Sequence, residues 1–415
     1  MTDNKTMVII GTGRAGVQAA MTLREENATC RVILISEDSD RPYDKVPLSK
    51  HYLYGKPGFH SLYFNDENFY ADNDIELWLD SPVAAIDTKQ REVTLRSGER
   101  QGYDQLLLAT GLAVNRWTGP GADLAGVHYL RTLADAKRLR KTLYQVAEDG
   151  GSVAVVGSGW IGCEAAAAAY EHGVSVSLIG RNQLLLAKQV GPEIGEFFRR
   201  AHVEHGIQLH LDTDVTALHG TDSVQAVELA GGKQVTADVV LFGIGAAPRT
   251  ELAVAAGLDV AVPEAGGGIV TDEYLQTSAA GIFAAGDVAN VPNAALGTRS
   301  RREHHMTAKK QGEAAARSML GTGKPYAQVP FFFSDQFDIW METTGDLTGA
   351  DDFVMREYPG KDKFIAFWLR NGKLAAGMNV NIKGVPGTIE ALIKSGKQMD
   401  RDKLTNADIP LRELL

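Results

Sequence analysis

The stretch Met7-Val8-Ile9-Ile10-Gly11-Thr12-Gly13-Arg14-Ala15-Gly16 decides the fold of this chain. Its apolar, β-branched run predicts a buried strand, and glycines at the spacing Gly-x-Gly-x-x-Gly predict a tight turn into a helix over residues 17–26. In such a turn the glycines let the backbone approach a pyrophosphate, which the N-terminus of the helix attracts. The stretch therefore predicts a strand–turn–helix unit that binds a dinucleotide.

A second copy of the pattern lies further along the chain. Val153-Ala154-Val155-Val156 precedes Gly157-Ser158-Gly159-Trp160-Ile161-Gly162, and an alanine-rich helical stretch follows. One such match is a weak signal, but two in the right context predict two dinucleotides bound at once. That arrangement is typical of an electron relay between a flavin and a nicotinamide.

Bulk composition excludes several classes of protein. A chain of 415 residues is long enough for about three domains. Its net charge of −10 argues against nucleic-acid binding, which needs clustered positive charge. No run of 18 apolar residues predicts a membrane span, and the polar start of the chain leaves no room for a signal peptide. We therefore expect a cytoplasmic protein.

The two cysteines, Cys30 and Cys163, exclude further classes. They lie far apart in the sequence, which argues against a disulfide framework and against a four-thiolate metal site. They do not form a closely spaced redox pair either. We interpret both as buried small apolar residues, and we expect no metal site.

The remaining elements follow from periodicity and turn residues. Asn371-Gly372 separates two strand-like runs and predicts a hairpin turn. The proline-containing segment 41–50 predicts a loop before a helix. Other expected elements are strands at 30–35, 103–111, 174–179, 283–287, 331–333, 363–369 and 374–380, β-structure over 207–245, and helices at 135–149, 307–320 and 388–395.

Eight motifs in order resemble the FAD-dependent pyridine-nucleotide oxidoreductases. More closely, they are similar to the bacterial ferredoxin and rubredoxin reductases, with apoptosis-inducing factor as a relative. The motifs are the first fingerprint, Arg41-Pro42-Tyr43 with Pro47-Leu48-Ser49-Lys50, Ala109-Thr110-Gly111, the second fingerprint with Glu164, Gly243-Ile244-Gly245, Ala285-Gly286-Asp287, Arg302-Glu303-His304-His305, and Phe333-Ser334-Asp335-Gln336.

This resemblance implies an α/β fold with two Rossmann-like domains and a C-terminal α+β domain. The FAD-binding domain is expected to be split between residues 1–113 and 246–325. The NAD(P)-binding domain would be inserted between these parts, at 114–245. The C-terminal domain, 326–415, would shield the flavin.

The resemblance also implies the residues of the FAD site. Gly13 and Ala15 would lie closest to the pyrophosphate, while Glu37 would accept hydrogen bonds from the adenosine ribose, unless it is only an exposed strand-end acid. Arg131 would approach the flavin nucleotide, although a solvated cation at a helix start is an alternative. The remaining expected contacts come from Gly11, Arg14, Gly16, Lys45, Lys50, Ala109, Thr110, Gly111, Gly245, Gly286, Glu303, His304 and Phe333, with Val83 near the adenine, Asp287 on the ribityl chain and His305 near the isoalloxazine.

Lys50 and Glu164 are the expected catalytic pair. The resemblance implies that the lysine lies beside the flavin N5 and pairs with the glutamate after the second fingerprint. A cation there would stabilise the anionic reduced flavin, and the carboxylate would fix the lysine and orient the nicotinamide amide. The alternative is that Glu164 is an ordinary acid in the first turn of a helix, favoured by the helix dipole.

The coenzyme is expected to lie against Gly157, Gly159, Trp160, Ile161 and Gly162, with Glu164 beside it. After the strand at 174–179 an NAD enzyme has an acid for the ribose 2′-hydroxyl, but this chain has Gly180-Arg181. Arg181, helped by Lys188, favours NADPH, whereas Gly162 as third glycine favours NADH. Dual use remains open, as does Arg181 being a plain surface cation.

Without a thiol between the flavin and its oxidant, disulfide and peroxidase chemistry lack their nucleophile. A hydride from NAD(P)H would reduce FAD, and single electrons would pass to a [2Fe–2S] ferredoxin that serves an oxygenase. The cluster Arg299, Arg301, Arg302, Lys309 and Lys310 is a candidate docking site for an acidic ferredoxin, or an ordinary solvated surface.

Three departures from the common ferredoxin-reductase pattern keep other functions open. They are Lys45-Val46 in place of Arg-Pro, Phe333 in place of a tryptophan, and His305. One alternative is a reductase of a small acceptor: a quinone, monodehydroascorbate or oxygen. The other is a redox-gated binding protein like apoptosis-inducing factor.

Overall fold

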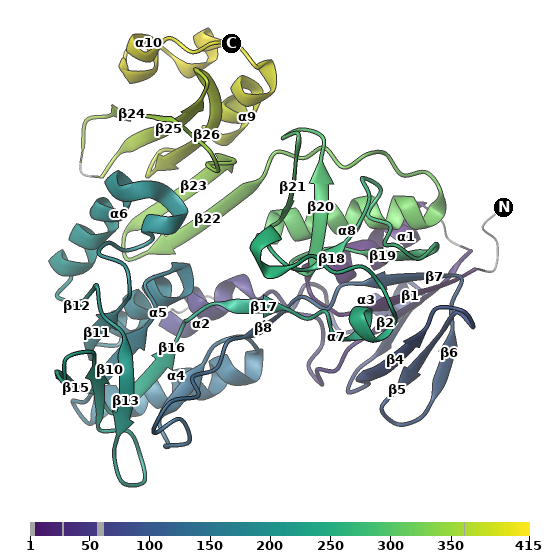
Figure 1. Ribbon diagram of the computed structural model, residues 1–415, viewed down its shortest axis with the longest axis horizontal. Coiled ribbons are helices and arrows are strands. Elements are labelled where there is room, and N and C mark those ends of the chain that lie inside the picture. Colours follow the sequence, from purple (N-terminus) through teal and green to yellow (C-terminus); the bar gives the residue numbers. More distant parts are fainter. Residues whose placement is uncertain (1–4, 27–28, 56–61, 361) are drawn as a thin grey trace.

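The computed structural model describes residues 5–26, 29–55, 62–360 and 362–415. Figure 1 shows two parallel sheets side by side, with the N-terminal one toward the N label and an antiparallel sheet above the other. The mixed α/β fold expected from the fingerprints is confirmed.

The N-terminal sheet is built around the first fingerprint strand. Its five strands are all parallel and run in the order β19-β7-β1-β2-β3. Fully apolar runs such as Leu106–Leu108 suit it, because parallel strands are covered on both faces. The strand bounds are Ile282–Ala284 (β19), Gln105–Leu108 (β7), Thr6–Ile10 (β1), Arg31–Ile35 (β2) and Ile75–Trp78 (β3).

Two helices pack together against this sheet, α1 (Arg14–Glu26) and α8 (His305–Leu320). Gly312 of α8 lies against the backbone of Ala15, where a Cβ atom would collide with the carbonyl group. The first fingerprint is therefore held from behind by a distant helix. Smaller elements complete this half: α3 (Phe69–Asp72), β4 (Val83–Asp87), β5 (Glu92–Leu95), β6 (Arg100–Gly102), α7 (Glu251–Ala255), β18 (Ile269–Val270), β20 (Ala289–Asn293) and β21 (Thr298–Arg301).

The second fingerprint also follows the central strand of a five-stranded sheet, as the first one does. Its sheet is again fully parallel, in the order β12-β11-β10-β16-β9. The bounds are Gln208–His210 (β12), Ser175–Ile179 (β11), Ser152–Val156 (β10), Val239–Phe242 (β16) and Val127–Tyr129 (β9), with helices Leu133–Glu148 (α4), Trp160–Glu171 (α5) and Ala187–Glu204 (α6), and an antiparallel sheet of Val215–His219 (β13), Ala226–Leu229 (β14) and Gln234–Thr236 (β15).

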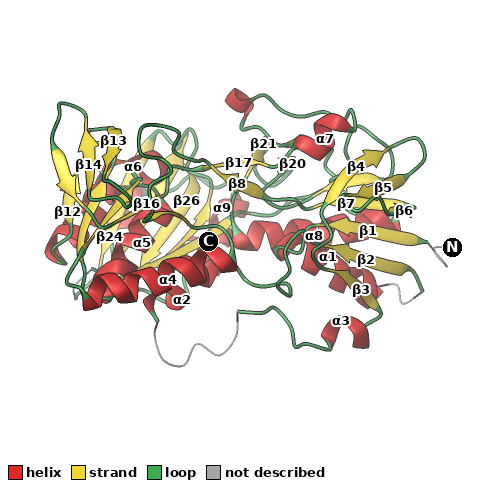
Figure 2. Ribbon diagram, turned by 90° about the horizontal axis from the view of Figure 1, so that it is seen from below, coloured by secondary structure: helices red, strands yellow, loops and turns green. Residues whose placement is uncertain are grey.

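Two short strands carry the chain between the parallel sheets. β8 (Leu112–Val114) leaves the N-terminal half, and β17 (Ala246–Pro248) pairs with it antiparallel on the return. Figure 2 shows this pair between the two halves of the molecule. The strands of the second parallel sheet and helices α4, α5 and α6 lie between them in the sequence.

The C-terminal sheet is antiparallel, in the order β22-β23-β26-β25-β24. Asn371 and Gly372 form its two-residue hairpin with φ of 51° and 72°, as the sequence predicts. One face packs on α6 through Phe197 and Phe364, and the other face packs on α9. The bounds are Phe331–Gln336 (β22), Ile339–Gly345 (β23), Asp352–Glu357 (β24), Phe364–Arg370 (β25), Lys373–Val380 (β26), Pro386–Ser395 (α9) and Arg401–Thr405 (α10).

Several local boundaries differ from the sequence expectations; the strands expected at 103–111 and 283–287, for example, are shorter, at Gln105–Leu108 and Ile282–Ala284. The loop expected over 41–50 contains a 3₁₀ helix, Val46–Ser49, that leads into α2 (His51–Tyr54). Helix α4 begins before Asp135, because the Asp135 side chain and Thr132 form a reciprocal capping box at its start. Among the described residues, no helix is long and apolar enough to cross a membrane.

Candidate functional site

A cavity of about 1380 Å³ runs between the two parallel sheets. Both fingerprints line it, at the carboxyl ends of β1 and β10, where open α/β sheets bind their ligands. Phe331, Phe332 and Phe333 of the C-terminal sheet also line it. All the candidate site residues border this cavity except Gly16 and Gly162.

Those two glycines have a packing role. A Cβ atom on Gly16 would strike the carbonyl of Gly11, and one on Gly162 would strike the carbonyl of Gly157. They allow the helix to lie close to the turn and are not among the described residues that line the cavity, so their contact with a cofactor stays a prediction. A Cβ atom on Gly13 would meet nothing within 4 Å, so the backbone at this glycine is open to the cavity.

Both turns are built alike. The amide of Gly11 donates to Ile35 O at 2.8 Å, and the amide of Gly157 donates to Ile179 O at 2.8 Å. Each first glycine has positive φ, 112° and 126°, and abuts the end of a neighbouring strand. Because these contacts leave no room for a side chain at either first glycine, the backbone of each turn can approach a pyrophosphate at this point.

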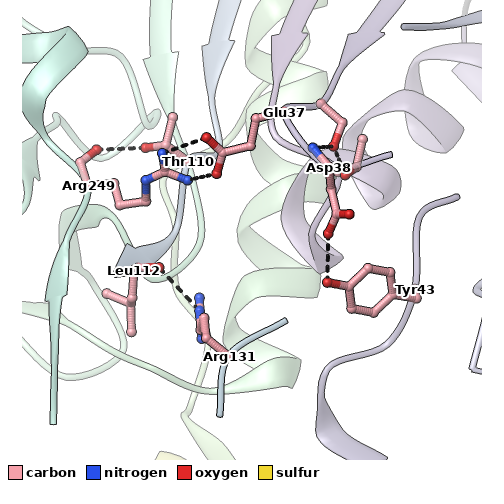
Figure 3. Close-up of polar contacts among 9 residues, drawn as sticks. Glu37, Asp38, Tyr43, Thr110, Leu112, Arg131 and Arg249 are labelled. Carbon is pink, nitrogen blue, oxygen red and sulfur yellow. Dashed lines mark hydrogen bonds and ion pairs between the residues drawn. The ribbon is translucent and has the colours of Figure 1, made fainter. Parts of the chain in front are cut away.

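Glu37 lies at the cavity wall with an unforeseen partner (Figure 3). Arg249 donates to both of its carboxylate oxygens, at 2.8 Å through Nη2. This hydrogen-bonded guanidinium holds the pKa of Glu37 below its usual value. Thr110 Oγ1 donates to Arg249 O at 2.8 Å, which links the pair to the strand-end turn. No sequence motif used above contains Arg249.

A second charged group surrounds Asp287, which also borders the cavity. Arg131 Nη2 lies 3.7 Å from its carboxylate and Arg131 Nε donates to Leu112 O at 3.2 Å. Arg131 is therefore held inside the site, and the solvated-cation interpretation is wrong. Burial raises the pKa of Asp287, while Arg131 opposes that change. Burial, reinforced by Arg131, lowers the pKa of Lys45 to about 8.

The loop that carries Lys45 is fixed by hydrogen bonds. Tyr43 OH donates to Asp38 Oδ2 at 2.8 Å and accepts from the amide of Leu133 at 3.0 Å (Figure 3). Burial raises the pKa of Tyr43, so the phenol stays protonated. The tyrosine thereby ties the loop to the start of α4.

Lys50 and Glu164 form a buried ion pair where the halves of the molecule meet. Lys50 Nζ donates to Glu164 Oε1, and Ser49 and Ser334 donate to the same carboxylate at 2.6 Å each. Glu164 is beyond the first turn of α5, which contains no acid, so the helix-dipole interpretation is wrong. Donors from two segments that are distant in sequence thus converge on the carboxylate of a third. Both serines belong to the motifs quoted above, but sequence reasoning gave them no role.

The histidine motif also borders the cavity. His305 Nδ1 lies 3.4 Å from Asp44, and despite burial this contact and the Val46 amide keep the pKa of Asp44 below its usual value. Burial lowers the pKa of His304 to about 4, and its ring packs on Phe332 at 5.1 Å. His304 Nδ1 is buried without a hydrogen-bond partner.

The basic cluster is largely engaged within the chain. Arg301 pairs with Glu303 at 2.8 Å and also donates to Asp287 O at 3.1 Å. Intramolecular contacts also hold Arg302 on Asp346, Lys310 on Glu313 and Arg299 on Asn290 O. Most of these positive side chains already have partners within the chain, so the expected docking site has fewer charges available for a ferredoxin than the sequence indicates.

Near the second fingerprint, the cavity is lined by Gly159, Trp160 and Ile161 together with Gly180 and Arg181. Arg181 Nε donates to Asp214 Oδ1 at 2.5 Å. Lys188 borders the same cavity from the start of α6. The arginine is thus exposed but paired, with a carboxylate that sequence reasoning missed.

Neither cysteine takes part in this site. Cys30 and Cys163 are buried, and neither is among the described residues that line the cavity. Burial raises the pKa of both thiols, which disfavours the reactive thiolate. No group of three or more His, Cys, Asp or Glu side chains in the described part of the chain is arranged to hold a metal ion.

Comparison with known proteins identifies the family. Residues 5–312 match the family described as pyridine nucleotide-disulphide oxidoreductase, and residues 331–415 match the family described as reductase C-terminal. The chain belongs to this oxidoreductase family, whose cofactor and coenzyme are FAD and NAD(H).

Named relatives resemble the chain over nearly its whole length. It is 36% identical over 410 residues to the 5,5′-dehydrodivanillate O-demethylase ferredoxin reductase subunit of Sphingobium sp., covering 98% of this chain and 97% of that one. It is 34% identical to the ferredoxin–NAD(P)(+) reductase of Sphingomonas sp., covering 91% and 90%. The reductase in the crystal structure of the covalent putidaredoxin reductase–putidaredoxin complex superimposes with a TM-score of 0.93 at 31% identity, covering 99% and 98%.

Proposed function

We propose that this protein is an NAD(P)H:ferredoxin reductase that supplies a [2Fe–2S] ferredoxin of an oxygenase system. The observation that carries the proposal is the Lys50–Glu164 pair, which is buried at one cavity between the two glycine turns, with neither cysteine among the described residues that line this cavity. Relatives named as ferredoxin reductases, one a subunit of an O-demethylase, support the same function.

The cavity fits FAD and a coenzyme together. Ligand sites commonly measure ~300–1,000 Å³, and this cavity of about 1380 Å³ is larger. The open backbone at Gly13 and the unpartnered buried atoms Arg14 Nε and His304 Nδ1 leave polar groups that a bound dinucleotide would satisfy. Bound FAD would accept a hydride from the coenzyme and release electrons singly.

We assign the split FAD-binding domain to 1–113 and 246–325, the NAD(P)-binding domain to 114–245 and the C-terminal domain to 326–415. The β8–β17 pairing supports the two crossings between the first two domains. Gly11, Gly13, Arg14 and Ala15 would hold the pyrophosphate, with Glu37 on the ribose and Val83 near the adenine. The remaining FAD contacts would come from Lys45, Ala109, Thr110, Gly111, Arg131, Gly245, Gly286, Asp287, Glu303, His304, His305 and Phe333.

Lys50 would place one positive charge where negative charge develops during hydride transfer. Glu164 holds that ammonium in place and is itself held by Ser49 and Ser334. Since all four side chains are buried, no reorganisation of water accompanies the reaction at this point. Lys50 Nζ also lies over the Phe333 ring at 5.7 Å, which ties the pair to the C-terminal sheet.

For the coenzyme we propose a preference for NADPH, with NADH also accepted. Gly157, Gly159, Trp160 and Ile161 would receive its pyrophosphate. Glycine occupies position 180, where NAD enzymes have the acid that binds the 2′-hydroxyl, and Arg181 could donate hydrogen bonds to a 2′-phosphate. A relative named as an NAD(P)(+) reductase supports dual use.

The test is cytochrome c reduction by the FAD-loaded protein with NADH or NADPH, with and without added [2Fe–2S] ferredoxins. We expect turnover to depend strongly on a ferredoxin. Equally fast reduction of quinones or oxygen without ferredoxin would instead identify a small-acceptor reductase. Reoxidation that takes many seconds with every acceptor would identify a redox-gated binding protein. Failure of both coenzymes to reduce bound FAD would overturn the proposal.

A further inference from the structure

Position 180 has no space for the side chain of the acid that binds the ribose 2′-hydroxyl in NAD enzymes. A Cβ atom on Gly180 would lie 2.6 Å from Ser158 Oγ and 2.7 Å from Ser158 Cβ. Ser158 is buried inside the second fingerprint turn, where its Cβ cannot move without moving the turn. The glycine is therefore required by packing, and any carboxylate at this end of the cavity must come from elsewhere.

A neighbouring segment supplies one. The segment from His210, the last residue of β12, to Thr213 runs beside Gly180-Arg181 through backbone hydrogen bonds: Gly180 N–H to His210 O at 2.9 Å and Thr213 N–H to Gly180 O at 3.2 Å. The next residue, Asp214, borders the cavity and accepts from Arg181 Nε at 2.5 Å. A carboxylate thus stands beside the position where β11 ends.

We propose that Asp214 is the specificity-determining partner of Arg181, an inference that rests on the proposed use of NAD(P)H. Its carboxylate can only accept hydrogen bonds, so it suits the 2′-hydroxyl of NADH. A 2′-phosphate carries a charge of about −1.5 to −2 and is repelled by the same group. Asp214 therefore limits the preference for NADPH that Arg181 creates.

The geometry allows both functions in one pair. The bond to Asp214 uses Nε of Arg181, whereas the terminal guanidinium nitrogens are the donors suited to a phosphate. The two side chains are 78% and 59% exposed, so their ion pair contributes little to stability and a ligand can rearrange it. Asp214 thus changes ligand choice without holding the fold together.

The test compares Asp214→Ala with Glu196→Ala, which removes an acid from another exposed arginine pair of the same half, Glu196–Arg199. Calorimetry gives Kd values of the FAD-loaded proteins for adenosine 2′,5′-bisphosphate and for 5′-AMP, which differ only in the 2′-phosphate. We expect Asp214→Ala to shift the ratio of the two Kd values by about tenfold toward the bisphosphate, with no shift for Glu196→Ala. Arg181→Met is expected to shift it in the opposite direction.

Flavin reduction by NADH and NADPH is measured on the same samples, and kcat/KM should move in the same direction as the Kd ratio. An unchanged Kd ratio in Asp214→Ala, or an equal shift in Glu196→Ala, would overturn this inference. Bound FAD that neither coenzyme reduces in the unaltered protein would overturn the proposed function, while the nucleotide titrations would still report on Asp214.

Discussion

Lys50→Met is the substitution that most directly tests the buried ion pair. The side chains of Lys50 and Glu164 are each 4% exposed, and methionine keeps much of the lysine's length without its charge. Two unit charges ~4 Å apart at an effective dielectric constant near 20 attract by ~4 kcal/mol. Ser49 and Ser334 still donate to the orphaned carboxylate. We therefore expect a loss of ~3 kcal/mol of unfolding free energy, at the lower end of the cost of breaking a buried pair.

The effect on hydride transfer should be larger than the effect on FAD binding. Removing one preorganised donor from a site of developing negative charge slows a reaction by ~10²-fold or more. Because the proposed pyrophosphate contacts are made by the turn at Gly11–Ala15 and not by Lys50, we expect FAD to remain bound. The assay is anaerobic stopped-flow bleaching of the flavin by NADPH, with urea denaturation run on the same protein.

The control for this variant is Lys394→Met in α9. Lys394 forms an exposed ion pair with Glu390 at 2.6 Å, outside the cavity, so both the bleaching rate and the stability should stay nearly constant. Bleaching of Lys50→Met at the unaltered rate, with folding and FAD content intact, would refute the role assigned to the lysine. Equal slowing in Lys394→Met would show that the effect is not specific.

Other predictions concern stability. Burial lowers the pKa of His202 to about 4, below the ~6.5 of an unfolded histidine. Between these two pH values the unfolded chain binds a proton that the folded chain does not, so the folded state loses stability as the pH falls. Urea titrations should show a loss of ~3 kcal/mol of unfolding free energy between pH 6.5 and 4, and a smaller loss in His202→Gln. Arg356 is fully buried and donates to three backbone carbonyls of the C-terminal segment, so Arg356→Met should cost ~3 kcal/mol and expose that segment to proteolysis; unchanged proteolysis would contradict this. Gly312→Ala should cost ~1–3 kcal/mol and weaken FAD retention, because its methyl group meets the Ala15 carbonyl. Gly387→Ala, whose methyl group meets nothing within 4 Å, is its control and should leave thermal stability and FAD retention nearly unchanged.

The sequence by itself determined the two dinucleotide units and the hairpin of the C-terminal sheet. Each is a local pattern: an apolar run with glycines at fixed spacing, or Asn371-Gly372 between two strands. Local steric rules govern such turns, since only glycine fits where a Cβ atom would meet the next strand, as at Gly11 and Gly157. The resemblance then supplied the order of the domains and the Lys50–Glu164 pair.

The tertiary structure alone decided which charges are free. The partners of these charged side chains come from other segments of the chain, and no spacing rule relates the two members of a pair. The pairs are Glu37 with Arg249, Arg181 with Asp214, and Glu164 with Ser49 and Ser334. The basic cluster around Arg301 looks available in the sequence but is mostly bound to acids and carbonyls. A local pattern fixes backbone shape, whereas the partner and the burial of a charged side chain depend on what folding brings beside it.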